Sequence, residues 1–262
     1  MGSAALHIAR TGLDANDTRM RVISNNLANV NTTGFKKDRA AFETLAYQVV
    51  TAPGAQSTAE TRYATGLNLG TGVRIQGTAR IDTQGSLQTT GNSLDLALDG
   101  DGYFQVQLPG GQLGYTRAGN FSRSAEGLLV TSEGYQVQPG ITVPEGTTAI
   151  TIGGDGTVSA TVAGQTEATQ LGQIQVASFA NPGGLQAAGD NYLMETAASG
   201  AVNMGIAGQD GRGQVRQGML EGSNVNVVEE LVDMIETQRA YEVNSKMISA
   251  TDEMLKYVNQ NI

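Results

Sequence analysis

The last 36 residues of the chain read VVEELVDMIETQRAYEVNSKMISATDEMLKYVNQNI, from Val227 to Ile262. No glycine or proline interrupts this stretch, and an apolar residue recurs at every seventh position. That repeat predicts one long helix whose stripe supercoils against a partner. Asn226, with Glu229 three positions on, is typical of a helix start. The stripe comprises Val227, Met234, Tyr241, Ile248, Leu255 and Ile262.

The start of the chain carries a matching stripe with the same seven-residue spacing. Residues 1–39 hold six basic and three acidic side chains, whereas residues 224–262 hold three basic and seven acidic ones. Opposite charge and a shared repeat indicate that the two terminal helices pair. Apolar positions on another side of the last helix, such as Met247, Met254 and Val258, need further neighbours. The first stripe comprises Leu6, Leu13, Met20 and Leu27.

An amide-rich run follows the first stripe, with four asparagines between Ser24 and Thr33. Asparagine is a poor interior helix former because its side chain competes for backbone hydrogen bonds. We therefore expect the first helix to span residue 3 to about residue 33 and to stop at Gly34. Two interpretations of the run stay open: a solvated helix end, or a band of amides that bonds to neighbouring chains.

The middle of the chain differs in composition, since 33 of the 35 glycines lie between Gly34 and Gly222. Residues 34–72 are an extended connector with a turn at Pro53-Gly54, and residues 56–63 are a loop or an edge hairpin. Short alternating apolar runs separated by glycine-rich turns then predict antiparallel strands. The predicted fold is α+β, with a helical polymerisation domain (1–33 and 224–262), the connector (34–72) and an all-β outer domain (73–223).

Composition and motifs argue against an enzyme, a metalloprotein and a nucleic-acid-binding protein. The net charge of −9 disfavours nucleic acid as a partner, and no apolar run is long enough to span a bilayer. The start of the chain lacks the features of a cleaved signal peptide. His7 is the only histidine, and the Asp99–Gly102 segment lacks the acidic ligand that completes a calcium loop. We expect no enzyme activity, no metal and no cofactor.

Residues 24–36, SNNLANVNTTGFK, closely resemble the signature of bacterial flagellar rod and hook axial proteins. Residues 221–235 and 238–242 resemble the other end of the same family. Pro53, Gly54 and Gln56, with residues 70–73, resemble the distal-rod branch rather than the hook branch. The signature residues are Asn25, Asn26, Leu27, Ala28, Asn29, Gly34 and Phe35.

The resemblance implies a structural subunit that leaves the cell through the flagellum's own export channel and self-assembles into a helical tube. That tube would be the distal rod of the basal body, crossing the periplasm as a rigid drive shaft. The implied partners are copies of the chain, proximal rod proteins, the hook protein, and the P- and L-ring bushing. The alternatives are a proximal-rod or hook paralogue, or a cell-surface-binding β-module with a helical stalk.

Overall fold

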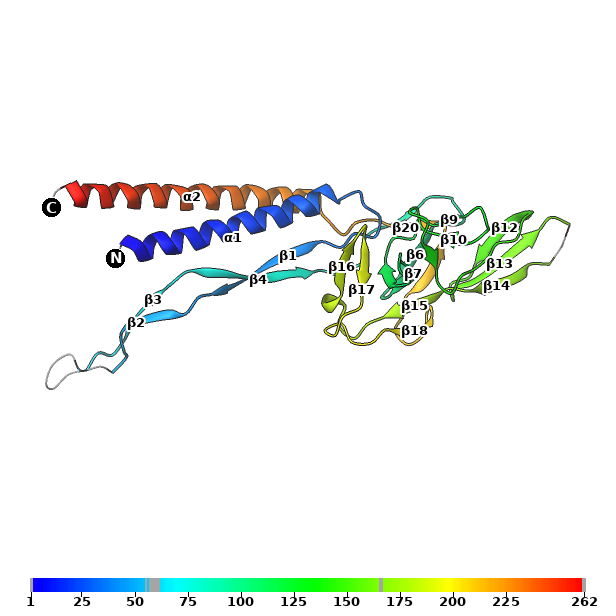
Figure 1. The fold of residues 1–262 in the computed structure, drawn as a ribbon, viewed down its shortest axis with the longest axis horizontal. Helices are drawn as coiled ribbons and strands as arrows, with labels where there is room; N and C mark the ends of the chain where they lie inside the picture. Colours follow the sequence, from blue (N-terminus) through cyan, green and yellow to red (C-terminus); the bar gives the residue numbers. More distant parts are fainter. Residues whose placement is uncertain (1, 55, 57–61, 165–166, 261–262) are drawn as a thin grey trace. The chain divides into compact units, whose positions relative to one another are not determined.

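A computed structural model describes residues 2–54, 56, 62–164 and 167–260. The fold is α+β, as predicted, with a helix at each end and antiparallel strands between them (Figure 1). The chain forms two compact units. Unit 1 contains Met1–Leu27, Asp38–Ala79 and Asn226–Ile262, and unit 2 contains Ala28–Lys37 and Arg80–Val225. The domain limits expected from the sequence stay a prediction.

Two long helices, α1 (Gly2–Ala28) and α2 (Val227–Gln260), lie side by side in unit 1 (Figure 1). The 34 residues of α2 span about 51 Å. Asn226 caps its first turn, because the Asn226 Oδ1 accepts a hydrogen bond from the Val228 N–H at 3.1 Å. The predicted start of the second helix is therefore confirmed. No helix in the described part of the chain is both long and apolar enough to cross a membrane.

The first helix ends at Ala28, earlier than the predicted stop at Gly34. Asn29 begins a turn, in which the Thr32 N–H and hydroxyl donate to the Asn29 carbonyl and side chain, both at 3.1 Å. Gly34 does adopt a positive φ of 68°. Glycine is needed at this position because of a tertiary contact and not because it caps the helix. A Cβ on residue 34 would lie 2.5 Å from the Arg117 carbonyl carbon.

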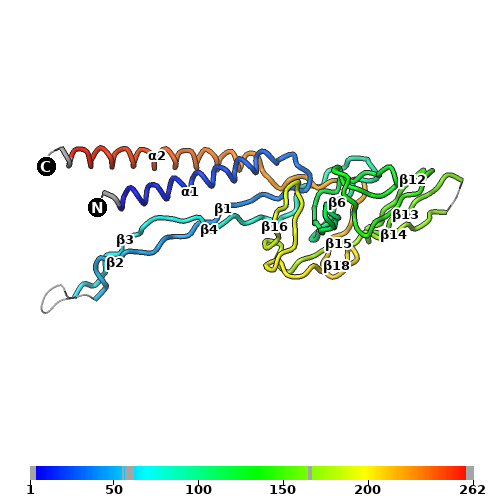
Figure 2. Tube along the Cα trace, in the orientation of Figure 1, coloured from blue at the N-terminus to red at the C-terminus, as the bar shows by residue number. Residues whose placement is uncertain are grey.

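The connector forms a two-stranded ribbon rather than an unpaired linker (Figure 2). In the half of the ribbon nearer residues 56–62, β2 pairs with β3 in antiparallel fashion. In the other half, β1 pairs with β4. Val73, the expected first residue of the outer β-domain, is the first residue of β4 in this ribbon. Gln56 and Arg62 form a β-bridge, and residues 57–61 lie outside the described part. The strands are β1 (Asp38–Thr44), β2 (Tyr47–Thr51), β3 (Leu67–Gly70) and β4 (Val73–Arg80).

Unit 2 is built from short antiparallel strands, as the alternating runs predicted. Its largest sheet has the order β16-β17-β8-β7-β11-β10-β9, with β15 pairing to β7 and β18. Smaller sheets pair β12-β13-β14, β6-β19 and β5-β20. The strands are β5 (Leu87–Thr89), β6 (Leu96–Asp99), β7 (Tyr103–Gln107), β8 (Leu113–Thr116), β9 (Ser122–Arg123), β10 (Leu129–Val130), β11 (Gln136–Val137), β12 (Thr147–Ile152), β13 (Thr157–Val162), β14 (Thr169–Gln173), β15 (Gln175–Ser178), β16 (Gln186–Gly189), β17 (Tyr192–Met194), β18 (Asn203–Ile206), β19 (Gln214–Gln217) and β20 (Met219–Glu221), with a 3-10 turn at Pro182–Gly184.

The core of unit 2 contains the inward residues of these strands. Leu96, Phe104 and Val106 are fully buried, and the ring of Phe104 meets that of Phe121 edge to face. One alternating apolar run does not form a strand: Ile141–Val143 contributes only an isolated bridge between Thr142 and Leu128. Both apolar residues of that run are nevertheless buried, so the pattern indicated the core and missed the strand pairing.

Candidate assembly surfaces

The two helices of unit 1 run antiparallel in a fixed register. The Asn26 Nδ2 donates to the Glu230 Oε2 at 3.2 Å. A Cβ at Gly12 would lie 2.9 Å from the Asn244 Nδ2, so the helices approach closely there as well. Fourteen residues separate the two contacts along each helix, which is two heptads. Arg19 and Asp233 form an ion pair between them at 3.2 Å, which is half exposed and contributes about 0–1 kcal/mol.

The predicted stripes lie along this pair but are incompletely covered. All four residues of the α1 stripe are half-buried, as are Met234, Ile248 and Leu255 of the α2 stripe. Val227 and Tyr241 are exposed, and Ile262 lies outside the described residues. No described member of either stripe is fully buried. Their assignment as assembly residues therefore stays a prediction.

Polar residues alternate with the α2 stripe on the face that meets α1. Glu230 and Thr237 are buried, and Asn244 and Thr251 are half-buried. These four positions interleave with Met234, Tyr241, Ile248 and Leu255 at the four-and-three spacing of a helical seam. Sequence reasoning identified the apolar set and missed the polar one, although the same spacing marks both.

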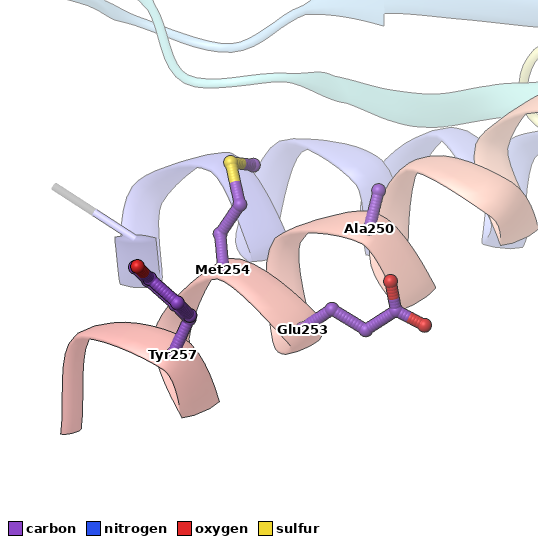
Figure 3. A pocket seen from close by; sticks show the side chains of 4 residues that line it. All are labelled: Ala250, Glu253, Met254 and Tyr257. Carbon is purple, nitrogen blue, oxygen red and sulfur yellow. The ribbon is translucent and has the colours of Figure 1, made fainter. Parts of the chain in front are cut away.

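A second apolar row runs along the opposite side of α2, and we call it the outer stripe. A helix turns about 100° per residue, which places this row on roughly the far side from the seam. Its side chains are 50–71% exposed. Figure 3 shows its last part, where Met254 and Tyr257 project from adjacent turns of α2 beside Ala250 and Glu253. The outer stripe comprises Val228, Val232, Ile235, Val243, Met247, Met254 and Tyr257.

The ribbon carries a further set of exposed apolar side chains. A two-stranded ribbon buries little apolar surface by itself, and most of the Tyr, Val and Leu side chains of this ribbon face water. Along the segment assigned to the distal-rod branch, the Gly54 N–H donates to the Tyr63 carbonyl at 2.9 Å, and Pro53 packs where a Cβ on Gly66 would lie. The exposed residues are Phe42, Tyr47, Val49, Val50, Tyr63, Leu67, Leu69 and Ile75.

Asn26, from the amide-rich run, follows neither of the two interpretations left open by the sequence. It is buried within unit 1. Its Nδ2 donates to the Asp38 carbonyl at 2.9 Å as well as to Glu230, and its Oδ1 accepts from the Asp38 N–H at 3.0 Å. One side chain thus joins α1, α2 and β1. Of the other signature residues, Asn25 and Ala28 are exposed, Leu27, Asn29 and Phe35 are half-buried, and Gly34 is buried.

Gly12 allows a sharp test of the helix pair. Alanine at this position requires only that the Asn244 amide shift, and it raises helix propensity by about 1 kcal/mol. Leucine is too large for the same gap and should force the helices apart. We expect Gly12→Leu to lower the thermal midpoint of the circular-dichroism signal at 222 nm and Gly12→Ala to keep it. Equal midpoints would contradict the close approach. Gly77→Leu is the control, because a Cβ added there would have no atom of the described residues within 4 Å apart from its own chain neighbours.

The described residues offer little that resembles a catalytic or ligand site. No group of three acidic or histidine side chains among them could hold a metal ion. A hollow of about 150 Å³ in unit 2 is lined by polar groups, with Tyr192 as its one aromatic residue. The Tyr192 hydroxyl donates to Glu133 at 2.6 Å, and this bond lowers the pKa of that carboxyl. Burial, in turn, raises the pKa of Tyr192. The aromatic pocket expected of a carbohydrate-binding module is not found in this hollow.

Comparison with known families places the chain among the axial proteins of the flagellum. The flagella basal body rod protein family matches residues 6–36. The flagellar hook protein FlgE/F/G D1 domain matches residues 97–160, and the C-terminal domain of flagellar basal body rod FlgEFG proteins matches residues 216–261. These matches cover both helical ends and part of the β-domain, and they confirm the resemblance seen in the sequence.

Individual relatives show which flagellar axial proteins the chain is most similar to among those compared. The chain is 50% identical to the flagellar basal-body rod protein FlgG of Buchnera aphidicola from Acyrthosiphon pisum, over 98% of both chains. It is 47% identical to FlgG of Caulobacter vibrioides, also over 98% of both, and 38% identical to FlgG of Bacillus subtilis over 96% of both. The chain belongs to the FlgG family of flagellar basal-body rod proteins, and it is a structural subunit of the rod.

Proposed function

We propose that the chain assembles with copies of itself into the distal rod, a rigid tube that transmits motor torque to the hook. The supporting observation is the amount of apolar surface that one subunit leaves uncovered along the outer stripe and the ribbon. Burial contributes roughly 25 cal/mol for each Å² of apolar area removed from water. A contact that repeats by rotation and rise between identical subunits covers such faces in an open helical tube.

The same proposal assigns the partners and the route. Copies of the chain would cover the sides of each subunit, proximal rod proteins and the hook protein would meet the two ends of the tube, and the P- and L-rings would surround it. Export would proceed through the flagellum's own export channel. In this scheme residues 1–33 and 224–262 polymerise, residues 34–72 stiffen the tube, and residues 73–223 form its outer layer.

A proximal-rod or hook paralogue is the alternative that the relatives make most concrete. FlgF of Caulobacter vibrioides is 35% identical over 89% of this chain, whereas FlgG of the same organism is 47% identical over 98%. The higher identity and fuller coverage favour the distal-rod assignment. This difference in identity is measured over most of the chain and does not depend on a single motif.

Negative-stain imaging of the concentrated protein tests the proposal. We expect straight tubes. Curved tubes would favour the hook paralogue, and a protein that stays monomeric at every concentration would contradict self-assembly. The measurement needs no partner protein, so it isolates the contribution of the chain's own surfaces.

A further inference from the structure

The chain passes between its two units at several points, and three of them are tied together inside unit 2. Unit 2 ends its first segment at Lys37, resumes at Arg80 and ends again at Val225. The Lys37 N–H donates to the Asn224 Oδ1 at 2.7 Å, and the Asn224 Nδ2 donates to the Ile81 carbonyl at 2.8 Å. The Ile81 N–H donates to the Lys37 carbonyl at 2.9 Å, which closes a ring of three bonds.

A buried carboxylate joins the same three chain segments a second time. The Glu221 Oε1 accepts from the Lys36 Nζ at 2.5 Å and from the Gly85 N–H at 2.9 Å. The Lys36 Nζ also donates to the Thr83 carbonyl at 2.8 Å, and the Glu221 Oε2 accepts from Arg117 at 3.3 Å. Burial lowers the pKa of Lys36, and the hydrogen bond to Glu221 opposes that shift.

Stability alone is a poor explanation for this cluster. Apolar residues of similar volume often replace a buried ion pair without loss of stability. The apolar core of unit 2 includes Leu96, Phe104 and Val176 and is formed by other residues than these. The cluster instead fixes the geometry of the chain, because it holds three segments together at the place where they leave unit 2.

We propose that Asn224 and Glu221 form a clamp that makes these three chain segments carry mechanical load together. Bonds loaded in parallel each carry a fraction of the force, whereas a strand held alone loses its bonds one after another. The inference rests on the proposed torque-transmitting function for its biological meaning. The resistance of the clamp to force is a property of one subunit, so it can be measured without assembly of the tube.

Optical tweezers on the full chain can measure the clamp directly, because the chain has no cysteine and accepts engineered handles. Handles at Val228→Cys and Glu145→Cys pull the segment that contains Asn224 away from unit 2. Handles at Glu145→Cys and Gln186→Cys load unit 2 without crossing the clamp. We expect Asn224→Ala to lower the first rupture force at least twofold in the first geometry and to leave it unchanged in the second.

The matched control is Asn181→Ala, which removes another asparagine amide that donates to a backbone carbonyl of unit 2, Ala198, at 2.9 Å. It should leave both rupture forces unchanged. An unchanged force in Asn224→Ala would overturn the clamp. Equal losses in both pulling geometries, or an equal loss in Asn181→Ala, would overturn it too, because they would indicate general weakening of unit 2.

A second variant keeps the test decisive if Asn224→Ala fails to fold. Asn224→Asp keeps the acceptor for the Lys37 N–H but places a carboxylate oxygen against the Ile81 and Thr83 carbonyls. Its rupture force in the first geometry should therefore also fall below that of the parent. Amide exchange at Lys37 should be at least tenfold faster in Asn224→Ala than in the parent, and unchanged exchange would contradict the ring of bonds. Tube formation by the parent chain is a separate measurement, so failure of the clamp and failure of self-assembly are distinguishable.

Discussion

Replacing Gly119 with alanine should destabilise the β-domain by about 3 kcal/mol or more, at the upper end of what overpacking costs. A Cβ at this position would lie 1.6 Å from the Leu96 carbonyl oxygen and 3.3 Å from the Phe104 ring. The Leu96 N–H also donates to the Gly119 carbonyl at 2.9 Å, so the two backbones are held together. Leu96 and Phe104 are fully buried, and neither can move aside without opening the core.

Urea denaturation followed by far-ultraviolet circular dichroism would measure this loss, since the chain has no tryptophan for fluorescence. The midpoint should fall while the slope stays constant. Gly154→Ala is the matched control in the same unit, because the nearest atom to its Cβ is the Val215 carbonyl oxygen at 3.8 Å. We expect that variant to stay within about 0.5 kcal/mol of the parent. A Gly119→Ala protein with the parent's midpoint would contradict the described packing.

The helical ends of the fold could be predicted because their signals are local. The seven-residue repeat and the Asn226 cap depend on residues within one or two turns of each other. The end of α1 could not be placed as well, because the turn at Asn29 competes with the helix and Gly34 is fixed by a contact with Arg117. That contact joins residues more than 80 positions apart, and nothing near Gly34 in the sequence indicates it.

The candidate assembly surfaces were likewise predictable where the signal is local and unpredictable where it depends on residues distant in the sequence. Asn26 was recognised as part of a signature, but its partners are Asp38 and Glu230, and only the folded chain brings them together. The ribbon was expected as an extended segment, yet its strand pairing and exposed side chains depend on how the two halves of the connector align. The outer stripe was foreseen only at Met247 and Met254, because apolar residues on two sides of one helix obscure each other in a periodic pattern.

Replacing Val243 with aspartate should abolish tube formation and leave the monomer folded. Val243 lies in the outer stripe and is 58% exposed, so no core contact is lost in the single subunit. Valine and aspartate have similar helix propensities, so α2 itself should persist. If assembly covers the outer stripe, however, the aspartate would be buried without a partner, at a cost of several kcal/mol in each repeated contact.

Sedimentation and negative-stain imaging would measure the loss, and circular dichroism would check the fold. Ser245→Asp places the same charge on an exposed polar position of α2 away from the outer stripe and should still form tubes. Ile248→Asp should behave differently, because Ile248 is half-buried on the face toward α1. Its substitution should weaken the helix pair inside the subunit before any assembly occurs.

Normal tubes from Val243→Asp would show that the outer stripe faces open water in the rod. The lateral contacts would then have to come from the ribbon, where Val49→Asp provides the equivalent test at a side chain that is 60% exposed.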